Sequence, residues 1–320
     1  MPPRTPRTPR TRRTCRTRRR RARHPALFAS LFASALVCCA AGATVSVRAG
    51  AHDASAPVSH VAAATGGPTV SPSSPSAPAQ DRDGALATAV ADAVAGHGGG
   101  LSVAVLDVAS GATAAYAPGG GTYDTASVVK VDLVCALLLR AQDAGRDLTS
   151  QERTRAAAMI ERSDNDATTA VWDDLGGAAA LDAANERLGL TGTTGGSGPL
   201  WGLTQTTAAD RLTLLRQVFA PGDDAVLSAE SRSTVRQLMG SVEADQAWGV
   251  SAAGNAELKN GWLRRSTTQR WDVNSIGRVR VDGRQVLVAV LSDGSATMDA
   301  GVALVEAVAR AAVPVVSGAG

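Results

Sequence analysis

The stretch Asp124–Arg140 reads DTASVVKVDLVCALLLR, and the rest of the chain is organised around it. Residues 128–139 contain only two charged residues, Lys130 and Asp132, among apolar ones. A helix that is apolar on all sides lies inside a protein. Ser127 precedes Lys130 by one helical turn, so its hydroxyl and the amine share a face. The stretch therefore predicts a buried helix with a nucleophile beside a possible base at its N-terminus.

Lysine is rare in this chain. Of its 32 Lys and Arg residues, only Lys130 and Lys259 are lysines, as a high-GC, actinobacterial-type composition favours. Arginine serves equally well for surface charge, but a guanidinium stays protonated and cannot replace an amine that must lose its proton. The two lysines are therefore the first candidates for chemistry. The alternative interpretation is that they remain by drift and have no role.

Charge is divided unevenly along the chain. Residues 1–24 carry eleven Arg and no acid, and Arg48 is the only other charge before residue 52. The remaining 20 cations face all 29 acidic residues, so residues 52–320 have a net charge of −9. An acidic domain lacks the excess of basic residues that nucleic-acid binding needs. We expect a small-molecule partner, no nucleic-acid partner and a monomer.

An apolar run, Pro25–Val47, follows the arginine-rich start. A basic segment, an apolar segment and then small residues are typical of an export signal, and 41–43 and 49–51 are possible cleavage sites. The run is also roughly long enough to remain as a membrane anchor. Residues 1–51 are therefore expected to be a signal or an anchor, and the protein to be secreted or extracytoplasmic. Any membrane contact would be through this segment alone.

The remaining chain is expected to form one folded domain after a spacer. Residues 52–82 are rich in Ala, Ser and Pro and predict a disordered linker. The domain is expected at 83–314, with a tail at 315–320. Cys135 is the only cysteine after the N-terminal segment, and its position in the buried helix indicates a small core residue.

Periodicity predicts an α+β fold. Helices are expected at 83–96, 128–139, 148–162, 166–174, 177–188, 206–219, 227–239 and 298–312, and strands at 101–108, 112–117, 257–262, 271–281 and 284–291. Asp282-Gly283 is a strong two-residue hairpin signal between the last two strands. Strands from both ends of the domain must join. We expect a five-stranded antiparallel sheet flanked by helices, plus an all-α subdomain.

Several kinds of site are absent from the sequence. No His follows His97, which excludes a Ser-His-Asp triad and a His-ligated zinc site from the domain proper. A G-x-S-x-G elbow is also missing. We expect no cofactor and no metal. The activator of Ser127 is then an amine or a carboxylate.

Three motifs carry a family resemblance. Residues 127–130 are an S-x-x-K motif, Ser163-Asp164-Asn165 is S-D-N, and Lys259-Asn260-Gly261 is close to K-T-G. In this order they resemble the motifs of class A β-lactamases and penicillin-binding proteins. The resemblance covers about residues 83–314 and implies a β-lactamase/transpeptidase-like fold.

The residues suit acyl transfer. Ser127 would attack an amide carbonyl, and Lys130 would accept its proton, with burial and the charge of Lys259 lowering the pKa of that amine. Ser163 could relay a proton to the leaving nitrogen. Asn165 could position Lys130 and the substrate amide.

The substrate-binding residues follow partly from the resemblance. It implies an oxyanion hole formed by the backbone N–H groups of Ser127 and Trp262. Gly261 would let a substrate backbone approach the strand, and the change to Asn260 would alter carboxylate recognition. Two further expectations have an alternative: Arg270 could pair with a substrate carboxylate or be a solvated strand charge, and the side chains of Trp201 and Trp262 could line the cleft or simply pack.

The chain departs from the class A pattern in the loop 190–205. This loop should carry the glutamate that activates the hydrolytic water, yet it contains no acidic residue. Glu186 and Asp210 flank it without matching the motif, and Gln205 could orient a water but cannot take its proton. The S-D-N motif also follows Ser127 by 36 residues, a short spacing that predicts a reduced cleft wall.

These observations predict an exported serine hydrolase that opens a β-lactam or a D-alanyl amide of the cell wall through an acyl-enzyme on Ser127. Two alternatives remain. The protein could be a D,D-peptidase-like acyl-transferase. It could also be a non-hydrolytic sensor that binds penicillin or cell wall.

Overall fold

The structure is a computed structural model that describes residues 81–220, 222 and 225–318. These residues belong to one compact unit, Ser74–Gly320. The predicted signal or anchor (1–51) and residues 52–80 of the predicted linker lie outside the described residues. The described fold is therefore that of the predicted domain.

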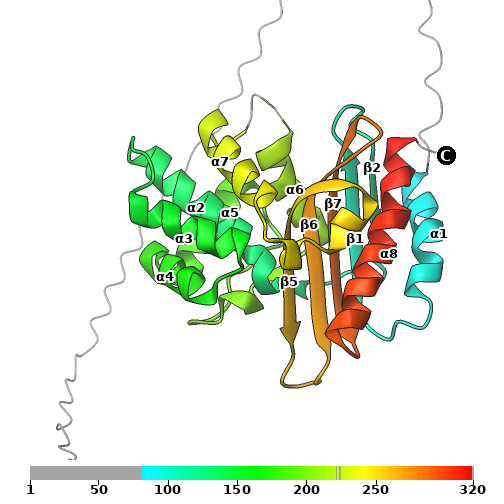
Figure 1. Cartoon of the computed structure of the whole chain (residues 1–320). Coiled ribbons are helices and arrows are strands. Elements are labelled where there is room, and N and C mark those ends of the chain that lie inside the picture. The colour runs from blue at the N-terminus through cyan, green and yellow to red at the C-terminus, as the bar shows by residue number, and fades with distance from the viewer. Residues whose placement is uncertain (1–80, 221, 223–224, 319–320) are drawn as a thin grey trace, which may run out of the picture. The chain divides into compact units, whose positions relative to one another are not determined.

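Five antiparallel strands form the central sheet in the order β2-β1-β7-β6-β5 (Figure 1). The strands are β1 Leu101–Asp107, β2 Thr113–Tyr116, β5 Asn255–Arg264, β6 Trp271–Val281 and β7 Arg284–Ser295. Strands from both ends of the domain join in one sheet, so the expected α+β fold is confirmed. The β6–β7 hairpin turns at Asp282 and Gly283, whose φ angles of 49° and 74° fit a two-residue turn.

The central strand β7 shows why this sheet is stable. Val286, Val288 and Val290 pack in the apolar cluster on one face, whereas Leu287 and its alternating neighbours pack in the cluster on the other face. Successive side chains of a strand point to opposite faces, so a strand buried on both sides is an unbroken apolar run. The sequence VLVAVL in β7 is such a run.

Helices cover both faces of the sheet. The helices α1 and α8 pack on one face, and α6 packs on the other, next to the block formed by α2–α5 and α7 (Figure 1). The bounds are α1 Arg82–Val94, α2 Val129–Asp143, α3 Ser150–Glu161, α4 Asn165–Leu175, α5 Gly177–Leu188, α6 Ala208–Phe219, α7 Ala229–Gly240 and α8 Met298–Ser317. The expected all-α subdomain is the block beside the sheet.

Both ends of the domain differ slightly from the expected bounds. Asp81 caps α1 by accepting a hydrogen bond from the N–H of Gly84, so the helix begins inside the predicted linker. Helix α8 continues through Pro314 to Ser317, because Val313 and Val316 are buried in the sheet-facing cluster. This helix is long and apolar enough to cross a membrane, but half of its apolar window is buried within the domain, as in a core helix.

A second, two-stranded sheet was not predicted. Strand β3 (Tyr123–Asp124) pairs with β4 (Gln205–Thr206), just before helix α6. Two residues give too little periodicity to be recognised in a sequence. The pairing joins the segment before Ser127 to the end of the loop 190–205, and it thereby brings that loop to the start of the buried helix.

Candidate active site

Ser127 lies in a tight turn at the start of the buried helix. A short 3-10 helix, Ala126–Val128, leads directly into α2, and Ser127 is partly exposed within it. Ala126 has a φ of 47°, a conformation that a residue other than glycine adopts rarely. Backbone strain of this kind is concentrated at functional sites because the surrounding structure must hold it in place.

Strand β5 holds this turn by close contact at Gly261. A Cβ atom on Gly261 would lie 2.7 Å from the backbone nitrogen of Ser127 and 2.8 Å from the carbonyl oxygen of Thr125. Only glycine fits there. Gly261 therefore makes room for the turn that carries Ser127, and approach of a substrate backbone to this strand stays a prediction.

The Lys130 amine lies in a polar cluster made by the S-D-N segment. Its Nζ donates hydrogen bonds to the carbonyl oxygen of Ser163 at 2.6 Å, to Ser163 Oγ at 3.0 Å and to Asn165 Oδ1 at 2.9 Å. Asp164 caps helix α4 through the N–H of Ala167 and so fixes Asn165 as the first helical residue. The motif thus positions two side chains on one amine.

Lys259 reaches the same hydroxyl from the opposite side. Its Nζ donates to Ser163 Oγ at 3.0 Å and to the carbonyl oxygen of Asn260 at 2.9 Å. A serine hydroxyl has two acceptor sites and one proton. Because both lysines donate to Ser163, the hydroxyl proton of Ser163 is free to point elsewhere, as a proton relay requires.

Both amines are easier to deprotonate than ordinary lysines. Burial lowers the pKa of Lys130 to about 7, against the opposing effect of the negative charge on Asp164. Burial, and after it the charge on Lys130, lowers the pKa of Lys259 to about 7. Burial disfavours the charged form of an amine, and a like charge adds to the effect. Burial is the larger cause for both amines, and the repulsion between their charges adds to it.

Ser127 itself makes no side-chain hydrogen bond among the described residues. Its hydroxyl is one helical turn from Lys130, whose amine is directed to Ser163 and Asn165. Catalytic hydrogen bonds are often long before substrate binds and shorten in the complex. The arrangement can supply a nucleophile, a neutral amine and a relay hydroxyl, which are the groups that acyl transfer needs.

Comparison with known proteins agrees with this geometry. A family model described as "Beta-lactamase enzyme family" matches residues 152–316, just over half of the 320-residue chain. The chain belongs to the beta-lactamase enzyme family. No curated protein matches the sequence.

Solved structures share the fold of this beta-lactamase family member. A class A beta-lactamase from Bacteroides cellulosilyticus has 15% sequence identity and a TM-score of 0.64, covering 74% of this chain and 98% of its own. A beta lactamase from Burkholderia vietnamiensis has 24% identity and a TM-score of 0.61, with coverages of 73% and 97%. One from Xanthomonas campestris has 21% identity and a TM-score of 0.60, with coverages of 72% and 97%. The fold is that of class A beta-lactamases.

The loop 190–205 of this family member places an indole over the lysine. The Trp201 ring centroid lies 5.0 Å from Lys130 Nζ, and Trp201 Nε1 donates to Thr169 Oγ1 at 3.2 Å. Trp201 thus lies beside the lysine cluster, and its role as a wall of the cleft stays a prediction. An aromatic face attracts a cation but cannot accept a proton.

The side chain of Gln205 is held on both sides. Its Nε2 donates to a carboxylate oxygen of Asp124 and to the carbonyl oxygen of Leu203, and its Oε1 accepts from Thr122 Oγ1 at 2.9 Å. The Gln205 amide thereby completes the contact between β3 and β4. The role considered for Gln205 in orienting a water stays a prediction, and it would fall to the remaining acceptor site of Oε1.

Asn260, Trp262 and Arg270 do not bring their side chains to the lysine cluster. Asn260 is buried and donates to the carbonyl oxygens of Gln246 and Trp248, so it holds a neighbouring loop instead of substrate. The Trp262 ring packs 5.8 Å from the Trp248 ring, in the cluster on the α8 side. Alternation along β5 explains both, because Lys259 and Gly261 occupy the other face.

Arg270 is also placed differently from expectation. It precedes β6 in the turn after β5 and is exposed. Its side chain lines a separate cavity, together with Arg265 and Asp272. A role in pairing with a substrate carboxylate at Ser127 is therefore not supported.

Sequence reasoning missed Asn274, which anchors the nucleophile turn to the sheet. Asn274 Nδ2 donates to the carbonyl oxygens of Asp124 and Thr125 at 2.8 and 3.1 Å, and its Oδ1 accepts from the N–H of Ser292 at 3.1 Å. A fully buried Asn inside a strand must be hydrogen-bonded. The polar Asn274 among the apolar residues of β6 was therefore the feature of the sequence that could have predicted this anchor.

Proposed function

We propose that this family member is a serine hydrolase that opens a β-lactam or a D-alanyl amide through an acyl-enzyme on Ser127 and releases the acyl group slowly. The observation that carries the proposal is the convergence of Lys130 and Lys259 on Ser163, one helical turn from Ser127. Two buried amines with pKa values near 7 are suited to accept and pass on protons at neutral pH.

Acylation would proceed in two steps. Ser127 Oγ attacks the amide carbonyl while its proton passes to the neutral amine of Lys130, which gives a tetrahedral oxyanion. Backbone N–H groups of Ser127 and Trp262 would stabilise the oxyanion, and one such donor is often worth about 3 kcal/mol. The C–N bond then breaks as Ser163 gives its proton to the leaving nitrogen and takes one from a lysine amine. An ester on Ser127 and a free amine result.

Slow release follows from the loop 190–205. Hydrolysis of the ester needs a base that takes a proton from water. The carboxylates near the loop are engaged or remote: Asp210 accepts from the Gly192 N–H and from Thr193 Oγ1, Asp182 accepts from the Gly195 N–H, and Glu186 is exposed on α5. Trp201 lies against Lys130 instead. The acyl-enzyme would therefore outlive that of an efficient beta-lactamase.

Intact mass of the purified protein after exposure to a penicillin, followed over hours, tests the proposal. We expect a single adduct of the mass of the intact drug that persists for hours, is absent from Ser127→Ala and maps to Ser127. Loss of drug without a lasting adduct would mean efficient turnover by another water activator and would contradict slow release. With neither adduct nor drug loss, penicillin recognition itself would be wrong.

The missing base also favours a second candidate, a D,D-peptidase-like acyl-transferase. In that enzyme an amine, and not water, accepts the acyl group from Ser127. Adding a D-amino acid to the acyl-enzyme distinguishes the two: accelerated loss of the adduct with formation of a new amide would establish transfer. If no amine changes the lifetime of the adduct, the result would exclude acyl transfer and support the remaining alternative, a sensor that binds penicillin covalently.

The place of action is a further proposal. The arginine-rich and apolar residues 1–47 support export to the outside of the cytoplasmic membrane. Fractionation of cells that produce the full chain, followed by N-terminal sequencing, tests this. A protein that stays in the cytoplasm with residues 1–51 intact would contradict it.

A further inference from the structure

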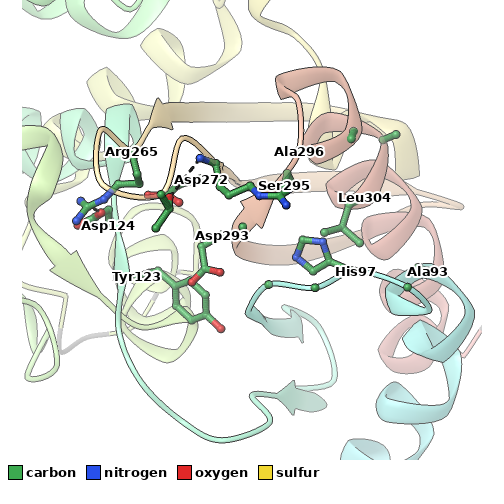
Figure 2. Close-up of a pocket in the computed structure, with 18 of the residues that line it drawn as sticks. Ala93, His97, Tyr123, Asp124, Arg265, Asp272, Asp293, Ser295, Ala296 and Leu304 are labelled. Carbon is green, nitrogen blue, oxygen red and sulfur yellow. Dashed lines mark hydrogen bonds and ion pairs between the residues drawn. The ribbon is translucent and has the colours of Figure 1, made fainter.

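A cavity of about 1020 Å³ lies next to the segment that leads to Ser127, because Tyr123 and Asp124 line it (Figure 2). It is bounded by the α1–β1 connection, the β5–β6 turn and the beginning of α8. Ser127, Lys130, Ser163 and Lys259 do not line it. Two segments connect the sites, because Asp124, which precedes Ser127, and Gln205, at the end of the loop 190–205, both line the cavity.

Three carboxylates gather in this cavity: Asp124, Asp272 and Asp293. Figure 2 shows Asp272 between the other two. Asp124 forms an ion pair with Arg265, and Asp293 accepts a hydrogen bond of 2.7 Å from the N–H of Gly100. Asp272 is only 5% exposed and forms no ion pair among the described residues; burial and repulsion from Asp124 raise its pKa, and the nearby Arg265 opposes this only in part. A buried carboxylate without a counter-ion is costly unless a ligand supplies the charge.

A second polar group in the wall is also unsatisfied. Ser295 is 3% exposed, and its hydroxyl has no hydrogen-bond partner within the part of the chain that the structure describes. It lines the cavity on the side of α8, near His97 (Figure 2). Buried hydroxyls without a partner are rare in native proteins and call for an explanation such as a bound group. An ammonium group has three N–H donors and needs several acceptors.

The rest of the wall indicates an organic ligand instead of a metal ion. Ala300, Ala303, Leu304 and Ala307 of α8, together with Ala93 of α1, form an apolar side. Within the described residues, no three His, Cys, Asp or Glu side chains are close enough to hold a metal. A cavity of this size, with one apolar side and a few convergent polar groups, is typical of a small-molecule site.

We propose that this cavity binds a small organic ammonium ion, with its charged group between Asp272 and Asp293 and its apolar body along α8. The ammonium group supplies the missing counter-charge of Asp272 and donates to the neighbouring acceptors. Arg265 remains paired with Asp124. Arg270 lines the exposed side of the cavity, and its positive charge repels the ammonium group of the ligand toward the inner end, where Asp272 and Asp293 lie. Such a site is independent of whether Ser127 reacts with penicillins.

Calorimetric titration of the purified protein with n-hexylamine at pH 8 tests the proposal, with n-hexanol as the uncharged probe. We expect one amine to bind per protein and the alcohol to bind at least tenfold more weakly. Asp272→Asn should weaken amine binding at least tenfold. The matched control Asp282→Asn, in the exposed β6–β7 turn, should leave it unchanged. Equal binding of amine and alcohol, or full affinity in Asp272→Asn, would overturn the proposal.

Two further variants keep the test decisive. If Asp272→Asn fails to fold, Asp293→Asn replaces it, because an amide oxygen retains the acceptor for Gly100 while the charge is removed. Ser127→Ala should bind n-hexylamine as tightly as the unmodified chain. Loss of binding in Ser127→Ala would place the amine in the catalytic cleft and contradict a separate site.

The ammonium group could belong to a free amine or to the substrate. Acylation rates for a penicillin with a side-chain amine and for its analogue without that amine distinguish the two sources. A rate advantage for the amino penicillin that Asp272→Asn removes would assign the cavity to the substrate. Equal rates, together with binding of n-hexylamine, would assign it to a separate amine.

Discussion

At the scale of single residues, the buried lysines determine how the reaction should depend on pH. An exposed lysine stays protonated until about pH 10, whereas burial lowers the pKa of Lys130 to about 7. The amine must be neutral to accept the proton of Ser127, so acylation should slow as the pH falls below 7 and reach a plateau above it. Because both lysines donate to Ser163, the midpoint belongs to the pair.

Stopped-flow acylation with a chromogenic penicillin between pH 5 and 9 measures this profile. Lys130→Arg is the matched variant, since a guanidinium keeps the positive charge and cannot become a base. It should lower the acylation rate by ~10²–10⁴-fold at every pH. A rate that stays level across pH 7, or a Lys130→Arg protein that acylates normally, would contradict a neutral lysine base.

Residue types indicated the candidate catalytic side chains, but not the contacts that the neighbouring side chains make. Lys130, Ser163 and Lys259 were recognisable because their chemistry needs those residue types at those spacings, and the structure brings them together. The side chains of Asn260 and Trp262 lie on the face of β5 opposite Lys259 and Gly261, where Asn260 binds a neighbouring loop and Trp262 packs on Trp248. What a strand residue touches depends on the loop packed over that face, which the sequence pattern does not reveal.

At the scale of elements, a buried ion pair joins helices α2 and α6. Arg211 donates to Asp132 at 2.5 Å, and both side chains are fully buried. Thr193 accepts a further hydrogen bond from Arg211, so the pair also fixes the loop that carries Trp201. Burial raises the pKa of Asp132, and the charge of Arg211 opposes this shift.

Removing one partner of this pair should destabilise the domain strongly. Asp132→Ala leaves the Arg211 charge buried and unpaired, and we expect a loss of about 3–5 kcal/mol in the free energy of unfolding. Replacing both partners, as in Asp132→Leu with Arg211→Met, should recover much of that loss. Urea denaturation measures both values.

The exposed pair of Asp143 and Arg187 is the control. Asp143→Ala should leave the urea midpoint essentially unchanged, because exposed pairs contribute little to stability. If Asp132→Ala were as stable as Asp143→Ala, the buried pair would not be what holds α2 and α6 together.

Helices and long strands were predictable from periodicity, whereas the short elements were not. Helix α3 was expected at 148–162, and a capping box of Thr149 and Glu152 starts it at Ser150. The two-residue strands β3 and β4 were missed because their pairing depends on contacts between distant segments. Helix α8 passes Pro314 because tertiary packing outweighs the local preference to end there.

At the scale of the whole molecule, the lysines and Asp272 should give stability an unusual pH dependence. A lysine with a lowered pKa in the folded state destabilises the protein below about pH 7, and this penalty disappears as the pH rises toward 10. Asp272 acts in the opposite sense. Burial and the nearby Asp124 raise its pKa to about 7, so its contribution falls as the pH rises from about 4 to 7.

Asp272→Asn isolates the acidic part of this dependence. Near pH 4 the carboxyl is neutral in the folded chain and largely neutral in the unfolded one, so the variant should melt close to the unmodified chain. At pH 8 the carboxylate is charged beside Asp124 and Asp293 in the folded state, and removing that charge should raise the melting temperature. The difference in Tm between the two proteins, followed from pH 4 to 9 with Asp282→Asn as control, should therefore grow between about pH 4 and 7 and level off above pH 7. A constant difference would mean that Asp272 titrates as an ordinary carboxylate, already solvated or already paired within the folded chain.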